Sequence, residues 1–155
     1  MEEKSQQYLD AYLELHEKSE KLKYNSFSSG YFCGDEDNAN TCADLIVKGI
    51  KTATCSMKYW YDNRGEKMPT VGHLHVVTTW GGEPVTIVET LSVSECTFSE
   101  VNEKFAYAEG EGDRSLKWWR QTHWEFFTTE CAEIGIEPTQ DMVLILEQFR
   151  VVYKK

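Results

Sequence analysis

The middle of the chain carries the pattern that most restricts its fold. Two runs rich in Val, Ile and Thr, Leu74–Trp80 and Val85–Val93, flank the pair Gly81-Gly82. β-Branched residues favour strands, and glycine adopts the positive φ angles that tight hairpin turns require. The pattern therefore predicts a β-hairpin at the centre of the fold.

Segments with the helical spacing of apolar residues surround this hairpin. Helices are predicted over residues 3–23, 38–48, 98–108 and 114–134, with further extended segments at 51–57 and 143–153 and a turn-rich break at 26–34. In the first helix the apolar stripe consists of Tyr8, Leu9, Tyr12, Leu13, Leu15 and Leu22. Helices set apart from antiparallel strands indicate an α+β domain, with a small barrel or a curled sheet.

Length and charge limit the number of domains and the class of partner. The 155 residues suffice for one structural unit, and the 16 basic and 26 acidic side chains give a net charge of −10. Nucleic-acid affinity is built mainly by neutralising phosphates with Lys and Arg. We therefore expect no long DNA or RNA track, whereas a local pocket for one nucleoside or a short RNA element remains compatible with the charge.

The sequence also bears on the compartment. The longest apolar run, Met142–Leu146, is far shorter than the roughly 20 residues that span a bilayer, and the N-terminal residues are polar. Five scattered cysteines form no Cys-x-x-Cys pair, which favours reduced thiols over a disulfide framework or a zinc knuckle. We expect a cytoplasmic protein that does not associate with membranes.

The segment Gly49–Thr54 is the first candidate for chemistry. A helix that ends at Gly49 and leads into a strand would place Lys51 and Thr54 at an element boundary, where side chains reach a cleft. Lys51 could act as a base if burial lowers its pKa, or as a cation for a developing oxyanion. Thr54 supplies a hydroxyl that a base could activate. The alternative is a Lys and a Thr on an exposed edge strand.

The segment Ala108–Ser115 is the second candidate. Its two glycines permit close approach of a ligand, and Asp113 can cap the helix that follows. The negative charges of Glu109 and Glu111 are favourable near the N-terminal end of that helix, which is the positive end of its dipole. The helix N-terminus could receive a phosphate or carbonyl oxygen, and the alternative is simply a well-capped helix.

Histidines and aromatic residues give weaker signals. His73-x-His75 lacks a second ligand pair with suitable spacing, so ordinary strand histidines are favoured over a metal site. In the aromatic helix Trp119 and His123 lie on one stripe that indicates core packing, whereas Trp118 lies off the stripe and could stack a base.

Together these motifs resemble the ASCH domain family, in particular its longer bacterial branch. The resemblance is carried by Gly49–Thr54, by Pro69-x-Val71-Gly72, and by Glu109–Leu116 with Trp119-Arg120 and His123. It runs from about Asn25 to Tyr153, so residues 1–24 are expected to be a helix that packs on a domain of residues 25–155. The resemblance implies a PUA-like small β-barrel with flanking helices. His73 departs from the branch, which usually has an acid there.

The resemblance also implies chemistry. Small bacterial relatives are amidohydrolases that remove acetate from N4-acetylcytidine with a lysine, a threonine and a glutamate, which correspond to Lys51, Thr54 and Glu111. Other members have been assigned ribonuclease activity, and eukaryotic ones are RNA-binding modules. Further residues of the two motifs are expected to bind the substrate: Thr52, Gly110, Gly112, Asp113, Arg114 and Ser115.

Two divisions of labour are open for amide hydrolysis on an acylated nucleobase or nucleoside. In the first, Lys51 is held partly neutral by burial and deprotonates Thr54 or water, while Glu111 handles the proton of the leaving amine. In the second, Glu111 is the base and Lys51 stabilises the oxyanion. Neither scheme requires a metal or another cofactor. The alternatives to an amidohydrolase are a non-catalytic RNA-binding module and a metal-independent ribonuclease.

Overall fold

The predicted hairpin is present at the centre of the sheet. A computed structural model describes residues 1–16, 24 and 26–154. In it β3 (Leu74–Thr78) pairs antiparallel with β4 (Pro84–Thr97), and Gly82 in the turn has a φ of +87°. β4 extends four residues beyond the predicted end because its last residues pair with the C-terminal strand β5 (Val143–Lys154).

The sheet has five strands in the order β1-β3-β4-β5-β2. β2 (Ala53–Met57) pairs antiparallel with β5, and β1 (Phe27–Gly30) pairs parallel with β3. The expectation of a turn-rich break at 26–34 is therefore wrong for residues 27–30. Their Ser and Gly content has low strand propensity, but pairing with the buried strand β3 overrides it.

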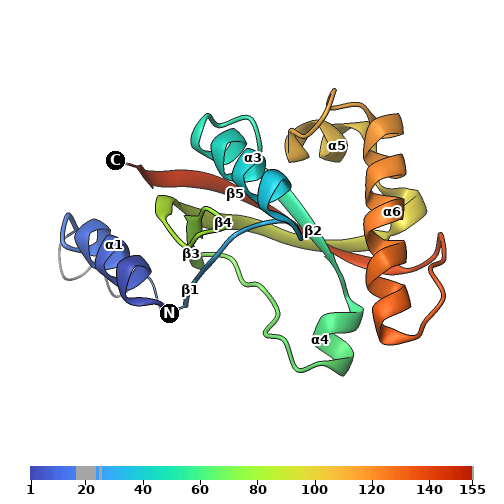
Figure 1. Cartoon of the computed structure of the whole chain (residues 1–155), viewed down its shortest axis with the longest axis horizontal. Coiled ribbons are helices and arrows are strands. Elements are labelled where there is room, and N and C mark those ends of the chain that lie inside the picture. The colour runs from blue at the N-terminus through green and yellow to red at the C-terminus, as the bar shows by residue number, and fades with distance from the viewer. Residues whose placement is uncertain (17–23, 25, 155) are drawn as a thin grey trace.

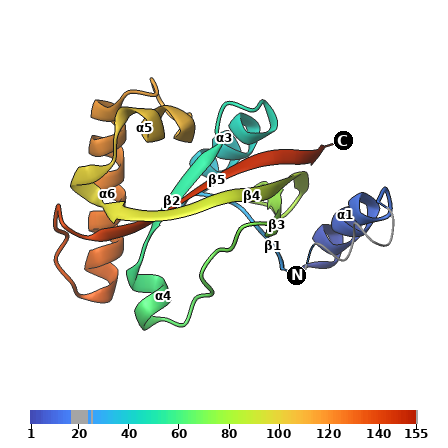
Figure 2. The same cartoon turned by 180° about the vertical axis from the view of Figure 1, so that it is seen from behind.

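The sheet is strongly curled (Figures 1 and 2). Phe27 and Ser28 of the edge strand β1 and Thr54 of the opposite edge strand β2 line one cavity of about 800 Å³. The two edges thus face each other across a cavity, as in a partly open barrel. This arrangement, together with the flanking helices, confirms the predicted α+β, PUA-like fold class.

Helices cover the sheet at several places. Figure 1 shows α1 (Glu3–Leu13) at one end of the sheet and α5 (Glu103–Glu109) with α6 (Leu116–Ile134) at the other, and α3 (Glu36–Val47) between them. The short helix α4 (Tyr59–Asn63), which the sequence pattern does not predict, follows β2.

The predicted helix over 98–108 is two elements. A 3₁₀ turn spans Phe98–Glu100, with a capping box between Thr97 and Glu100, and α5 begins only at Glu103. Val101 is extended between them, and the Asn102 side chain accepts a hydrogen bond from the Phe105 amide, at 2.9 Å. This N-cap starts a new helix, so a single helix is wrong here.

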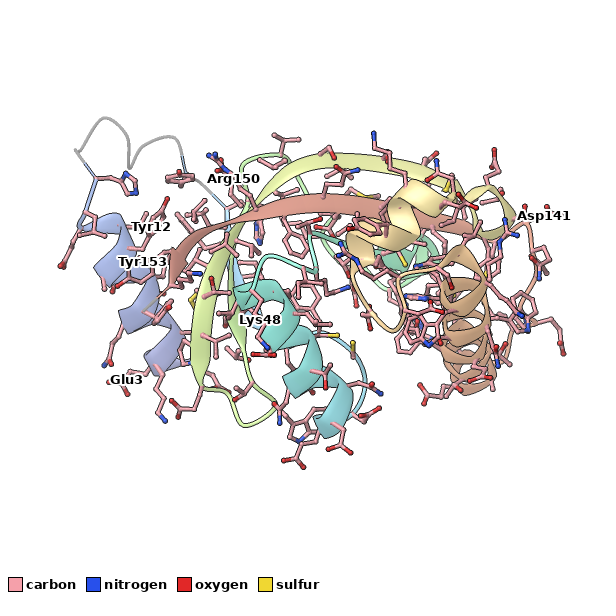
Figure 3. All side chains as sticks on the ribbon, turned by 90° about the horizontal axis from the view of Figure 1, so that it is seen from above. Glu3, Tyr12, Lys48, Asp141, Arg150 and Tyr153 are labelled. Atoms are coloured by element: carbon pink, nitrogen blue, oxygen red, sulfur yellow. The ribbon has the colours of Figure 1, made fainter. Side chains whose placement is uncertain are left out.

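The N-terminal helix packs on one end of the sheet. Tyr8, Leu9 and Tyr12 contact a cluster with Leu74, Val76 and Ile87. Figure 3 shows Tyr12 beside Tyr153 of β5, and the two ring centroids are 5.5 Å apart. The helix ends at Leu13, so Leu15 is 72% exposed and its predicted inward position is wrong. The predicted helical residues 17–23, Leu22 included, lie outside the described residues.

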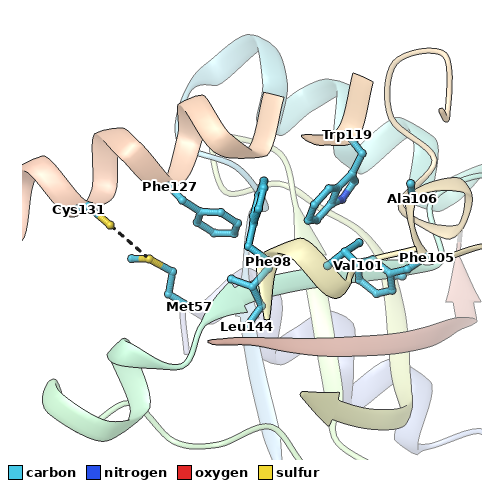
Figure 4. Packing of buried hydrophobic residues seen from close by; sticks show 10 residues of the cluster. Met57, Phe98, Val101, Phe105, Ala106, Trp119, Phe127, Cys131 and Leu144 are labelled. Carbon is cyan, nitrogen blue, oxygen red and sulfur yellow. Dashed lines mark hydrogen bonds between the residues drawn. The ribbon is translucent and has the colours of Figure 1, made fainter. Parts of the chain in front are cut away.

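A second cluster fills the space between the sheet and α5 and α6. Figure 4 shows Phe98, Trp119 and Phe127 packed above Leu144, with Met57 and Cys131 in contact beside them. Trp119 is on the predicted apolar stripe and is fully buried. This core fixes the positions of α5 and α6, from which part of the candidate site is built. None of the helices in residues 1–16, 24 and 26–154 is long and apolar enough to cross a bilayer.

Candidate functional site

Lys51 lies where the chain leaves α3 and enters β2. Gly49 follows the end of α3 with a φ of +75°, which reverses the chain direction. The backbone N–H of Thr52 then donates to the carbonyl of Ala108 at 2.7 Å, and its hydroxyl donates to the same oxygen at 3.2 Å. The Lys51 segment is thereby fixed against the end of α5.

Gly110 makes this approach possible. It ends α5 with a φ of +74°, and a Cβ at this position would lie 2.5 Å from the Ile50 carbonyl oxygen. Only a residue without a side chain allows the two segments to pass this closely. The residues on either side of Gly110, Glu109 and Glu111, are therefore presented to Lys51.

Lys51 forms ion pairs with both of these carboxylates. Its Nζ lies 3.0 Å from Glu111 Oε2 and 3.7 Å from Glu109 Oε1, and it also donates to the Glu109 carbonyl at 3.4 Å. Lys51 is 3% exposed and Glu109 is 1% exposed, whereas Glu111 keeps some solvent access. Of the three predicted catalytic residues, the structure thus brings Lys51 and Glu111 into direct contact.

Glu109 is the centre of a buried network. Its Oε2 accepts a hydrogen bond from Trp119 Nε1 at 2.6 Å and lies 2.7 Å from His123 Nε2. The other ring nitrogen of His123 lies 2.9 Å from the Trp119 carbonyl oxygen. Both neighbours of the His123 ring are acceptors, so both ring nitrogens donate and the ring is an imidazolium. Two cations, Lys51 and His123, then balance two carboxylates.

The charges reinforce one another's ionised states. Burial lowers the pKa of Lys51, but the carboxylates of Glu109 and Glu111 outweigh it, and the net pKa is raised above the usual range. Burial likewise opposes ionisation of Glu109, yet Lys51 and His123 hold its pKa below the ordinary value. Lys51 is therefore a fixed ammonium. The expectation that burial keeps it partly neutral is wrong, because that expectation did not include Glu109.

Thr54 lies apart from this pair. Along β2, Ala53, Cys55 and Met57 pack toward the core beneath α6, so the alternation of a strand directs Thr54 to the opposite face. There it lines the 800 Å³ cavity together with Glu147, its partner in the β2–β5 register. Within the described residues, no hydrogen bond joins the Thr54 side chain to Lys51 or Glu111.

The remaining residues of the second motif make structural contacts. Ser115, not Asp113, caps α6 by accepting from the Trp118 amide at 3.1 Å, while Asp113 accepts from the Ser115 amide at 2.8 Å. The Arg114 guanidinium donates to the carbonyls of Tyr107 and Ile50. Gly112 lies against the Trp118 indole, so this ring is covered by backbone on one face. Their expected role in substrate binding stays a prediction.

One wall of the cavity is a directed chain of serines and histidines. Ser28 Oγ lies 2.6 Å from both His73 Nε2 and His75 Nδ1, and Ser26 Oγ lies 2.6 Å from His73 Nδ1. His75 Nε2 lies 3.2 Å from the Gly30 carbonyl oxygen, which only accepts, so this nitrogen donates. With both rings neutral, Ser28 then donates to His75 Nδ1, His73 Nε2 donates to Ser28, and Ser26 donates to His73 Nδ1. Burial lowers the pKa of both histidines, that of His75 to about 4.

This cavity and the ion pair share a boundary. Tyr31 and Phe32 line the cavity, and Cys33, the next residue, has its Sγ 4.0 Å from Glu111 Oε1. Lys51 and Glu111 are not themselves among the lining residues. The segment Tyr31–Cys33 therefore adjoins both the cavity and Glu111.

Two clusters in the described residues have the donor types of a metal site. One is Cys33, Cys42 and Glu111, and the other is Cys55, Glu109 and His123. In the second cluster both His123 nitrogens carry protons, so the histidine has no free lone pair for a metal. Glu109 already accepts a hydrogen bond from Trp119 and forms an ion pair with Lys51.

Comparisons with other proteins find a family and solved structures that are similar to this chain. The ASCH domain family model matches residues 28–153. The chain is similar to an ASCH domain from Lactobacillus crispatus JV V101, with 56% identity over 99% of this chain and 96% of that one, and a TM-score of 0.96. It is also similar to a protein from Enterococcus faecalis V583, with 28% identity over 100% and 96% of the two chains and a TM-score of 0.85. No curated protein matches the sequence.

Proposed function

Because the chain belongs to the ASCH domain family, we propose that it hydrolyses an amide on an acylated nucleobase or nucleoside, such as N4-acetylcytidine. The family as a whole is RNA-binding and hydrolase-like. The observation that carries the proposal is the 3.0 Å ion pair between Lys51 and Glu111. The buried Glu109 forms a second ion pair with the same ammonium, at 3.7 Å. The net charge of −10 favours a small substrate over a nucleic-acid polymer.

The protonation states favour Glu111 as the base. Lys51 is an ammonium with two carboxylate neighbours, so it has no lone pair with which to take a proton. Glu111 would remove a proton from the water as its oxygen adds to the acyl carbon, and Lys51 would stabilise the oxyanion that forms on the former carbonyl oxygen. Glu111 would then return the proton to the amine nitrogen as the carbon–nitrogen bond breaks. No step needs a metal.

The cavity beside the ion pair supports a nucleobase-sized substrate. Its volume of about 800 Å³ lies in the range of small-molecule sites, and Tyr31, Phe32 and Phe149 provide aromatic surface against which a base can stack. In this arrangement Thr54 and Glu147 would hydrogen-bond the substrate from the β2–β5 wall. Thr54 would act as a binding group, and the proton transfers would belong to Glu111.

The experiment is incubation of the protein with N4-acetylcytidine, with free cytidine measured by chromatography and mass spectrometry. Glu111→Gln keeps the side-chain shape but removes the base, and we expect a loss of about 10²-fold or more in kcat. Lys51→Met removes the oxyanion cation with a similar expected loss. Glu125→Gln and Lys104→Met, both on exposed helix faces, are the matched controls.

A parallel incubation with a short RNA separates the alternatives. Shortened strands would indicate a ribonuclease, and salt-sensitive binding without turnover would indicate an RNA-binding module. Either result without release of cytidine contradicts the proposal. Retention of full turnover by folded Glu111→Gln protein, checked by circular dichroism, contradicts the assigned base.

A further inference from the structure

Two thiols lie side by side next to the Glu111 carboxylate. Cys33 Sγ is 2.8 Å from Cys42 Sγ, and both cysteines are free. Cys42 Sγ is 3.5 Å from Glu111 Oε1 and Cys33 Sγ is 4.0 Å from the same oxygen. We propose that Cys33 and Cys42 are a redox-active pair, which a small-molecule disulfide such as oxidised glutathione converts to an intramolecular disulfide.

The spacing favours a disulfide over a metal site. Two thiolates bound tetrahedrally to zinc, at about 2.3 Å each, lie about 3.8 Å apart, whereas the sulfurs of a disulfide lie about 2.05 Å apart. The observed 2.8 Å requires an approach of less than about 1 Å to reach bonding distance. The Lys51 ammonium, 3.0 Å from Glu111 Oε2, further opposes a cation at this position.

The environment assigns an order to the two thiols. Cys33 is partly exposed in the loop that follows β1, whereas Cys42 is 1% exposed on α3. The hydrogen bond with Cys33 and burial raise the pKa of the Cys42 thiol. Cys33 is therefore the thiol that meets an external oxidant, and Cys42 is the thiol that resolves the mixed disulfide.

The exchange balances in two steps. The Cys33 thiolate attacks one sulfur of oxidised glutathione, and the sulfur–sulfur bond breaks to release one glutathione thiolate. Cys42 then attacks the Cys33 sulfur as its proton passes to Glu111, and the second glutathione thiolate leaves. Two protein thiols are oxidised to one disulfide, and one glutathione disulfide is reduced to two thiols.

The remaining cysteines provide internal controls. Cys55, Cys96 and Cys131 lie on β2, β4 and α6, and no contact between two of their sulfurs occurs in the described part of the chain. Oxidation should therefore be specific to one pair. The two thiols lie 3.5 and 4.0 Å from Glu111 Oε1, so the proposed redox pair is in contact with the proposed base. Disulfide formation would also remove the S–H groups that face this carboxylate.

The test is treatment of the folded protein with oxidised glutathione, followed by thiol titration under denaturing conditions and peptide mass spectrometry. We expect the five thiols to fall to three and one peptide pair to carry a Cys33–Cys42 bond. The loop closed by this bond should raise Tm by roughly 5–10 °C, reversibly with dithiothreitol. Cys96→Ser protein should lose two of its four thiols in the same way, whereas Cys33→Ser protein should form no intramolecular bond.

Three results would overturn the proposal: a glutathione adduct that persists on Cys33, a disulfide through another cysteine, or thiols that all stay reduced. Zinc bound tightly to the untreated protein, with Cys33 and Cys42 protected, would assign the pair to a metal instead. None of these measurements uses hydrolytic activity. Failure of the redox pair and failure of the proposed hydrolase are therefore distinguishable.

Discussion

Replacement of Glu109 by Gln tests whether the buried carboxylate holds the site together. The substitution keeps the shape of the side chain and removes its negative charge. Lys51 and His123, which now share Glu109 and Glu111, would be left with one carboxylate between them. The cluster would change from electrically balanced to positive in a region from which water is largely excluded.

The contacts of Glu109 set the magnitude. Breaking a buried ion pair by removing one partner costs about 3–5 kcal/mol, because the other charge stays buried without compensation. The hydrogen bond from Trp119 Nε1 can persist to the Gln oxygen and therefore adds no further cost. With an m-value of about 2 kcal/mol/M, the urea midpoint should fall by about 1.5–2.5 M. Trp fluorescence reports the transition.

The dependence on pH makes this test specific. Burial lowers the pKa of His123, but the hydrogen bond and the charge of Glu109 outweigh it, and the net pKa is raised above the usual value. A raised pKa gives stability that is fully present below the unfolded value, about 6.5, and is lost as pH rises through the folded value. The difference between wild type and Glu109→Gln should therefore be largest near pH 6 and shrink toward alkaline pH.

The exposed Glu125→Gln variant is the control and should change stability by less than about 0.5 kcal/mol. If Glu109→Gln unfolds at the same urea concentration as wild type, the electrostatic argument is refuted. A difference that does not vary with pH would refute the assignment of the imidazolium, because a neutral His123 would contribute no such dependence.

Four further substitutions, at three positions, test the supports of the site by urea denaturation. Gly110→Ala should cost at least about 2 kcal/mol, because the positive φ and the 2.5 Å contact with the Ile50 carbonyl both oppose a side chain; an unchanged midpoint would contradict the close approach. Ser115→Ala should cost about 1 kcal/mol through loss of the α6 N-cap, and Ser115→Asn should restore most of it. Arg114→Lys should cost about 1 kcal/mol, because lysine cannot both stack on Tyr107 and reach two carbonyls; equal stability would show that these contacts contribute little.

The elements with strong local patterns were predictable. The Gly81-Gly82 hairpin and the aromatic helix α6 each have enough β-branched or periodic residues for local propensity and packing to agree. β1 was not predictable, because Ser and Gly carry almost no strand signal and its pairing with β3 joins residues more than 40 positions apart. The break between Phe98–Glu100 and α5 depends on the Asn102 cap, which a periodicity of apolar residues does not register.

The site was predictable in part. The motifs that resemble the family placed Lys51 and Glu111 together, but no rule of spacing gives a contact across 60 positions. Glu109 was interpreted only as a helix-end charge. A signal for its burial was present, because Glu109 follows the core residue Phe105 by four positions and so lies on the same helix face. The position of Thr54 was not predictable, because it depends on which face of β2 the core covers.

The position of β5 between β4 and β2 has a consequence for how the chain folds. β2 ends at Met57, and its pairing partner begins at Val143, so about ninety residues must be synthesised before the two can meet. Until then β2 exposes unpaired backbone groups, and the Thr52 carbonyl lacks the hydrogen bond that it accepts from the Phe149 amide of β5. Contacts between such distant positions slow folding. We infer that the β2–β5 pairing, and with it the wall of the cavity that carries Thr54 and Glu147, is completed late in folding.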